Sequence, residues 1–175
     1  MVINYCGEKC FKIQSGKVSL VVDPLPRFKG DITLLTGSWK DMAKEYPPVA
    51  GQIYGPGEYE MLETEITGLP MPQTQTAYTL VMEEIRLCFL GDGGENIDPS
   101  ILEKLGEVDI LFAPAGITAK SVKQIQPKII IPFYKKPAAL AEFLKEMEKK
   151  AEPEEKLVIK KKEITPGTKV VVLKA

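Results

Sequence analysis

The 175-residue sequence contains no histidine. Histidine is the most frequent general base in enzymes, the usual activating partner of a catalytic serine or cysteine, and the commonest metal ligand. A Ser-His-Asp or Cys-His catalytic group, a zinc ion held by imidazole and a haem held by histidine are therefore excluded within this chain. Any chemistry that it carries must be built from other side chains.

The chain also lacks an excess of charge of either sign. It has 23 Lys+Arg and 24 Asp+Glu, which gives a formal net charge of −1. Proteins that hold a phosphate backbone or an anionic lipid surface need an excess of basic residues. We therefore expect neither nucleic acid nor a membrane among its partners.

Cysteines are few, and long apolar runs are missing. Cys6, Cys10 and Cys88 are an odd number and form no Cys-x-x-Cys pair, so we expect reduced thiols and Cys88 as a small buried apolar residue. No stretch approaches the roughly 18 apolar residues of a membrane span, and residues 1–5 do not resemble an export signal. These features predict a cytoplasmic protein.

The first half of the sequence reads as short strands separated by turn residues such as Ser15-Gly16-Lys17 and Gly55-Pro56-Gly57. A helix is expected over 39–45, ended by Pro47-Pro48. Strands that meander in this way predict antiparallel pairing. The expected strands are 11–13, 18–22, 32–35, 52–54, 58–62, 65–68, 78–82 and 85–90.

The second half alternates helices with apolar strands. Asp98-Pro99-Ser100 has the form of a helix N-cap followed by proline at the first helical position. Further helices are expected over 121–126 and 137–150, and strands over 108–112, 128–132, 156–160 and 170–173. An exposed strand at 170–173 would offer an edge for pairing with a second copy of the chain.

The length and the element order together predict one domain over residues 1–175, with two packed sheets and helices on the outside.

Several motifs occur in an order that resembles the metallo-β-lactamase-fold hydrolases, in particular the branch of ascorbate-phosphate lactonases and uncharacterised zinc-dependent hydrolases. The resemblance implies an αββα sandwich of two mixed β-sheets flanked by helices. The motifs are Gly7-Glu8-Lys9-Cys10-Phe11, Val22-Asp23-Pro24, residues 31–36, Gly91-Asp92, residues 108–111 with Pro114, and Ile131-Pro132.

The zinc-binding motif of that family is Thr-His-x-His-x-Asp-His, and residues 36–42 of this chain read Thr-Gly-Ser-Trp-Lys-Asp-Met. The resemblance thus implies that Gly37, Trp39 and Met42 stand where the family has histidine. It also implies that two carboxylates of the site are kept as Asp41 and Asp92, and that Tyr134 stands at a late ligand position. Glycine, indole and thioether groups cannot replace imidazole on zinc, so no zinc and no other cofactor are expected.

These substitutions predict a remnant site. We expect Trp39 and Tyr134 to fill the former metal cavity, and Asp92 to be paired with Lys40 or with the backbone N–H groups of Gly93-Gly94, because an unpaired buried carboxylate is costly. Candidate ligand-binding residues are Gly37, Trp39, Lys40, Gly93 and Tyr134.

Three functions remain open at this point. The first is a non-catalytic domain that acts as a scaffold or binds a small molecule or a protein partner. The second is a hydrolase of a phosphorylated or lactone-like small molecule that holds Mg²⁺ or Mn²⁺ on Asp23, Asp41 and Asp92, with Glu8 as a further ligand. The third is a metal-free anion site in the glycine-rich turn 91–94.

Overall fold

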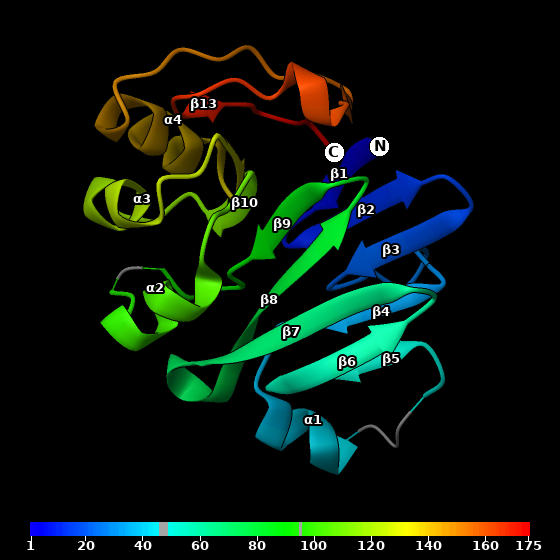
Figure 1. Ribbon diagram of the computed structural model, residues 1–175. Coiled ribbons are helices and arrows are strands. Elements are labelled where there is room, and N and C mark those ends of the chain that lie inside the picture. Colours follow the sequence, from blue (N-terminus) through cyan, green and yellow to red (C-terminus); the bar gives the residue numbers. More distant parts are fainter. Residues whose placement is uncertain (46–48, 95) are drawn as a thin grey trace.

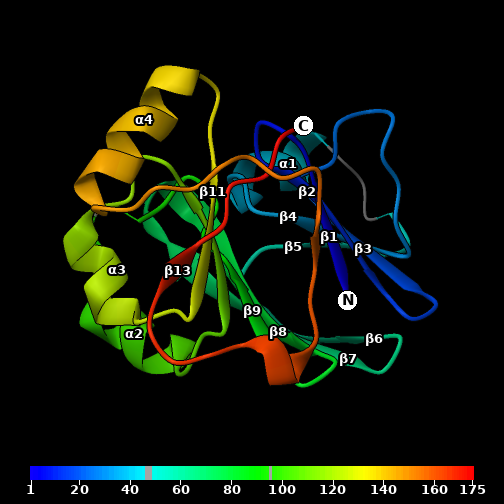
Figure 2. The same ribbon diagram turned by 90° about the horizontal axis from the view of Figure 1, so that it is seen from above.

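The computed structural model describes residues 1–45, 49–94 and 96–175 of the chain, so Pro47-Pro48, the expected end of the first helix, lie outside the described residues. Two mixed β-sheets pack face to face, with three helices against the outer face of one of them (Figures 1 and 2). This arrangement confirms the predicted α/β sandwich.

The first sheet has the strand order β12-β1-β2-β3-β4-β5. Its strands β12, β1, β2 and β3 pair antiparallel, whereas β3, β4 and β5 run parallel. Their bounds are β1 Val2–Gly7, β2 Cys10–Ser15, β3 Val18–Val22, β4 Ile32–Leu35, β5 Gln52–Tyr54 and β12 Leu157–Val158.

The second sheet has the order β13-β11-β10-β9-β8-β7-β6. It is antiparallel from β6 to β9 and parallel from β9 through β10 and β11 to β13. Its strands are β6 Gly57–Met61, β7 Thr64–Met71, β8 Gln75–Met82, β9 Ile85–Phe89, β10 Ile110–Pro114, β11 Ile129–Phe133 and β13 Lys169–Val170.

Helices α2 (Pro99–Leu105), α3 (Ala119–Ile125) and α4 (Pro137–Glu146) cover the second sheet, while α1 (Trp39–Glu45) lies beside β5 at the far end of the sandwich (Figure 1). The side chain of Asp98 accepts a hydrogen bond from the N–H of Ser100 (2.8 Å) and caps α2. This cap fixes where the helix begins. Two short 3₁₀ turns, Pro72–Thr74 and Lys161–Glu163, complete the described elements.

The main core lies between the two sheets, and a second one lies under the helices. Alternation along β9 shows the division, because Leu87 and Phe89 face the first sheet whereas Cys88, and Leu90 directly after the strand, face the helices. All three cysteines are free and buried, as expected for Cys88, where burial raises the thiol pKa to about 12. Among the described helices, none combines the length and the apolar character needed to cross a membrane.

Most of the predicted elements are confirmed, and three expectations are wrong. Strand β1 (Val2–Gly7) was missed, and the expected antiparallel pairing fails for β3, β4 and β5, because the chain crosses over between them. The last helix stops at Glu146 rather than Lys150, since Glu148 adopts a positive φ of 53° that ends the helical path.

The expectation of an exposed C-terminal strand is also wrong. Val171, Val172 and Leu173 are at most 1% exposed. The N–H of Val171 donates to the carbonyl of Ile130, and Leu173 forms a bridge with Glu154. Residues 171–173 are therefore covered by their own chain and are not exposed.

A buried carboxylate ties three distant segments together. Asp109, 4% exposed, accepts hydrogen bonds from the N–H of Arg86 (2.9 Å), from Lys128 Nζ (2.8 Å) and from Lys161 Nζ (2.5 Å). Burial by itself would raise the pKa of Asp109, but the Arg86 N–H and the two lysines outweigh it and lower the pKa to about 2.

Asp109→Asn is expected to lower the free energy of unfolding at neutral pH by about 1–2 kcal/mol, because the two ammonium groups lose their charged partner. The folded-state pKa of about 2 lies below the unfolded value of about 3.9, so this contribution is full above pH 4 and is lost as pH falls towards 2. Urea unfolding at pH 7, 4 and 2 measures it, with the neighbouring exposed Glu107→Gln as control. An equal loss in both variants, or a loss in Asp109→Asn that persists at pH 2, would contradict this account.

Candidate functional site

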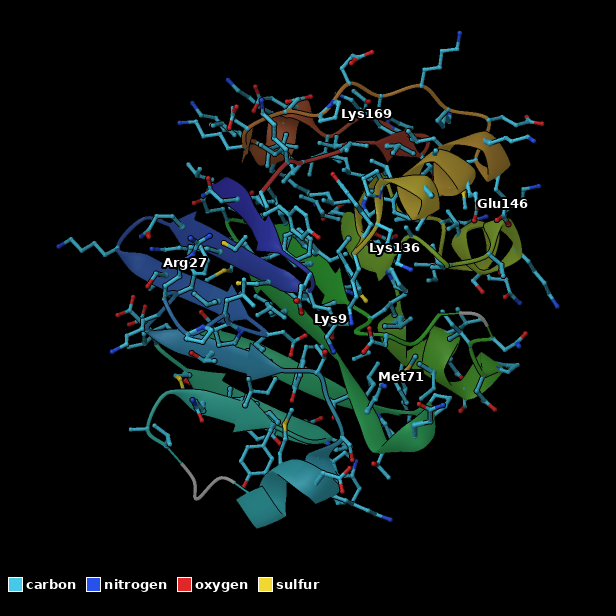
Figure 3. The ribbon with its side chains drawn as sticks, turned by 180° about the vertical axis from the view of Figure 1, so that it is seen from behind. Lys9, Arg27, Met71, Lys136, Glu146 and Lys169 are labelled. Carbon is cyan, nitrogen blue, oxygen red and sulfur yellow. The ribbon has the colours of Figure 1, made fainter. Side chains whose placement is uncertain are left out.

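Four segments meet at the carboxyl ends of strands from both sheets. Asp23 follows β3, Thr36 follows the parallel strand β4, and Gly91-Asp92 follow β9. Lys9 comes from the tight turn between β1 and β2. Figure 3 shows Lys9 near the centre of the molecule, far from the peripheral Glu146 and Lys169. The carboxyl ends of strands are where α/β proteins usually place their sites.

Asp23 clamps the ends of β3 and β4 together. Its Oδ1 accepts a hydrogen bond from the N–H of Thr36 (2.8 Å), and its Oδ2 accepts one from the Thr36 hydroxyl (2.5 Å). Gly91 packs closely on this pair, since a Cβ built there would lie 2.8 Å from Thr36 Oγ1 and the residue has a positive φ of 63°. Both carboxylate oxygens of Asp23 therefore already have donors.

The partner of Asp92 is Lys9. The ammonium of Lys9 donates to Asp92 Oδ2 at 2.8 Å, and the two side chains are 22% and 48% exposed. We expected Lys40 or the N–H groups of Gly93-Gly94 in this place, and for Lys40 the expectation is wrong. Lys40 Nζ lies over the ring of its neighbour Trp39, 5.4 Å from the centroid.

One ammonium, that of Lys9, lies near two carboxyl groups at the site. Partial burial works to lower the pKa of Lys9, but the charge of Asp23 and the hydrogen bond that Lys9 donates to Asp92 outweigh it and raise that pKa. Burial raises the pKa of Asp23, against the effects of Lys9 and Thr36. The arrangement keeps Lys9 positively charged at neutral pH.

Phenylalanine rings fill the space beneath these groups. Phe89 and Phe112 are stacked with centroids 4.3 Å apart, and Phe11 meets Phe112 edge-on at 4.8 Å. The cavity that they leave has a volume of only about 10 Å³, barely enough for one water molecule. It is lined by Lys9, Phe11, Val22, Asp23, Thr36, Phe89, Gly91, Phe112 and Phe133.

The aromatic residues expected to fill this cavity lie elsewhere. Trp39 packs beside Gly55, since a Cβ atom added to Gly55 would lie 3.4 Å from the Cβ of Trp39. The backbone N–H and carbonyl of Tyr134 both bond the hydroxyl of Tyr5, at 3.3 and 2.9 Å, and the two rings lie 5.8 Å apart. Neither Trp39 nor Tyr134 lines the cavity. Phenylalanines from the strands themselves take up that space.

The remaining predicted site residues do not line this cavity. Asp41 lies in the first turn of α1 and is exposed. Gly37 is closely approached by Met42, and Gly93 by Met71, since a Cβ on either glycine would lie within 2.8 Å of a methionine methyl. Of the predicted residues, Asp23 and Asp92 are the ones that the structure places beside Lys9.

Sequence reasoning missed Lys9 and the phenylalanines. Lys9 stands directly after Gly7-Glu8 in a tight turn between strands, which was a usable signal for a side chain at this edge. The phenylalanines sit inside apolar strands, where nothing separates a cavity-lining ring from an ordinary core residue.

Within residues 1–45, 49–94 and 96–175, no group of three or more His, Cys, Asp or Glu side chains is arranged to hold a metal ion.

Comparisons with known proteins agree with this fold. The sequence profile described as a beta-lactamase superfamily domain matches residues 2–134. A curated relative, the UPF0173 protein of Pyrococcus furiosus, is 26% identical over an alignment that covers 86% of this chain and 92% of the relative.

Solved structures show the same fold at low sequence identity. A Thermotoga maritima protein, described as a candidate Zn-dependent hydrolase of the metallo-β-lactamase superfamily, has a TM-score of 0.80 at 23% identity, covering 99% of this chain and 98% of that one. A metallo hydrolase of Ignicoccus hospitalis has a TM-score of 0.64 at 14% identity, with 91% and 99% covered. An isothiocyanate hydrolase from Delia radicum gut bacteria has a TM-score of 0.61 at 11% identity, also with 91% and 99% covered.

Thr36→Val is expected to lower the free energy of unfolding by about 1–3 kcal/mol, because it removes the hydroxyl donor of the carboxylate of Asp23 at nearly constant volume. Thr79→Val, on the outer face of β8, is the control and is expected to change it by less than about 0.5 kcal/mol. Urea unfolding measures both. Equal effects of the two substitutions would show that the hydrogen bond to Asp23 does not stabilise the site.

Proposed function

This chain belongs to the family of beta-lactamase superfamily domains, and we propose that within this family it is a non-catalytic, metal-independent domain that acts as a scaffold or binds a small ligand. The protein has a metallo-β-lactamase-type, hydrolase-like fold. We further propose that it derives from the ascorbate-phosphate-lactonase-like branch through loss of the zinc-binding histidines. The observation that carries the proposal is the ammonium of Lys9, which pairs with Asp92 at 2.8 Å in the place expected for metal ligands.

The side chains of this chain do not fit zinc. A zinc site needs about four nitrogen, sulfur or oxygen donors at roughly 2.0–2.3 Å. The chain has no histidine, both oxygens of Asp23 accept hydrogen bonds from Thr36, and Asp92 pairs with a cation. A positively charged ammonium beside Asp92 also repels any second cation.

The alternative of a Mg²⁺- or Mn²⁺-dependent hydrolase finds less support. It requires Asp23, Asp41 and Asp92 to converge, and the described residues contain no such group of three. Asp41 lies on α1, whereas the oxygens of Asp23 are turned towards Thr36. Asp92 is paired with the ammonium of Lys9, so that in the wild type its carboxylate is not available to a hard divalent cation.

A ligand, if the domain binds one, would lie outside the cavity between the phenylalanine rings. Ligand pockets usually have volumes of about 300–1,000 Å³, against the roughly 10 Å³ left between the phenylalanines. The candidate ligand-binding residues in our proposal are Trp39, Lys40, Gly37, Gly93 and Tyr134, none of which lines this cavity. An indole ring with an ammonium over it offers one apolar and one cationic surface, which suits a small anionic molecule with an unsaturated ring.

The metal content of the purified protein tests the proposal. After growth with added zinc, manganese and magnesium, followed by dialysis, we expect less than about a tenth of an equivalent of each metal by plasma mass spectrometry. A chelator is expected to leave Tm unchanged, because no bound metal stabilises the folded state.

An Asp92→Ala variant serves as the matched control, and its metal content is expected to equal that of the wild type. Near one equivalent of zinc in the wild type would overturn the proposal. Near one equivalent of manganese or magnesium that is lost in Asp92→Ala would establish the carboxylate-bound hydrolase instead.

A further inference from the structure

Two carboxylates that are 69 positions apart in the chain share one small region. Asp23 lines the same small cavity as Lys9, and Asp92 lies 2.8 Å from the ammonium of Lys9. The charge of Asp92 also acts on Asp23 in the unfavourable sense. Two carboxylates held beside one ammonium repel one another when both are charged, and the positive charge offsets this repulsion.

Lys9 supplies this counter-charge from a third segment. Its side chain lines the cavity with Asp23, Thr36 and the phenylalanine rings, and its ammonium reaches Asp92 Oδ2 at 2.8 Å. The apolar stem of lysine can pack against rings while the charged end meets a carboxylate. The contact joins the β1–β2 turn in the first sheet to the loop after β9 in the second.

A metal ion bound at strand ends has the same effect, because it lies between carboxylates from different segments, offsets their repulsion and links the segments. We propose that the ammonium of Lys9 is a built-in replacement for such a cation, so that the site keeps the electrostatic and structural role of a metal centre without a metal. This inference rests on the metal-independent function proposed above and adds the residue that makes metal unnecessary.

The replacement has a testable consequence, because removal of the ammonium should uncover affinity for a divalent cation. Without Lys9, Asp92 loses its ion-pair partner, while the carboxyl group of Asp23 still lines the cavity that Lys9 bordered. Carboxylates suit Mg²⁺, Ca²⁺ and Mn²⁺. With only two carboxylates the site would be weak, comparable to protein sites that bind calcium with Kd of about 0.1–1 mM.

The experiment compares Tm of the full chain with and without Mn²⁺ at about 10 mM, after chelator treatment, in four proteins: wild type, Lys9→Met, the double variant Lys9→Met/Asp92→Asn, and Lys12→Met. Lys12 lies on the neighbouring strand β2 and is the matched control for loss of a lysine. In the absence of Mn²⁺, Lys9→Met is expected to have a lower Tm than Lys12→Met, because it leaves the carboxylates without their counter-charge.

Mn²⁺ is expected to raise Tm of Lys9→Met by about 3–6 °C, which corresponds to a concentration of roughly ten times Kd in a chain of this size. No comparable rise is expected in the other three proteins. An equal response of Lys9→Met and the double variant, or no response of Lys9→Met, would overturn the inference. If Lys9→Met does not fold, Lys9→Gln takes its place.

Lys9→Arg provides a second arm, because it keeps the positive charge. It is expected to retain most of the wild-type Tm and to show no response to Mn²⁺, and a response as large as that of Lys9→Met would also overturn the inference. The two proposals fail separately: zinc bound to the wild type would refute the metal-independent function, whereas a metal-free wild type with an unresponsive Lys9→Met would refute only the role of Lys9.

Discussion

The burial of the facing surfaces of two mixed sheets is the constraint on which this structure depends. Side chains such as Phe11 from the first sheet and Phe112 from the second meet in one aromatic core, and this contact sets how the sheets sit on each other. Once the two sheets are packed, the turn that carries Lys9 and the loop that carries Asp92 are close enough for the two side chains to form an ion pair. The polar centre is thus held in place by apolar packing beneath it.

The elements that the sequence predicts best are those whose ends are marked by turn residues or by the limits of apolar runs. Strands 18–22, 32–35 and 52–54 and helix 39–45 have the expected bounds, because turn residues or apolar runs mark their ends. Pairing direction could not be predicted in the same way. Parallel pairing of β3, β4 and β5 depends on how the intervening segments cross over, and local residue patterns do not contain that information.

The site could be predicted only in part, for a related reason. The resemblance pointed to Asp23 and Asp92, and the structure brings both close to Lys9. It could not show that Lys9 pairs with Asp92, since the reach of this side chain depends on a turn in which Gly7 and Glu8 have φ of 98° and 55°. Trp39 was misplaced because spacing in the sequence does not indicate which side of a helix faces a cavity.

The segment from Leu157 to Leu173 supplies an edge strand to each sheet, β12 beside β1 and β13 beside β11. Lys161 within it reaches the buried Asp109. Both edges exist only after the two sheets have formed, and the pairing of β12 with β1 joins residues about 155 positions apart. This segment is therefore expected to dock last during folding, so that closure of the sandwich and completion of both sheets occur as one late, cooperative step.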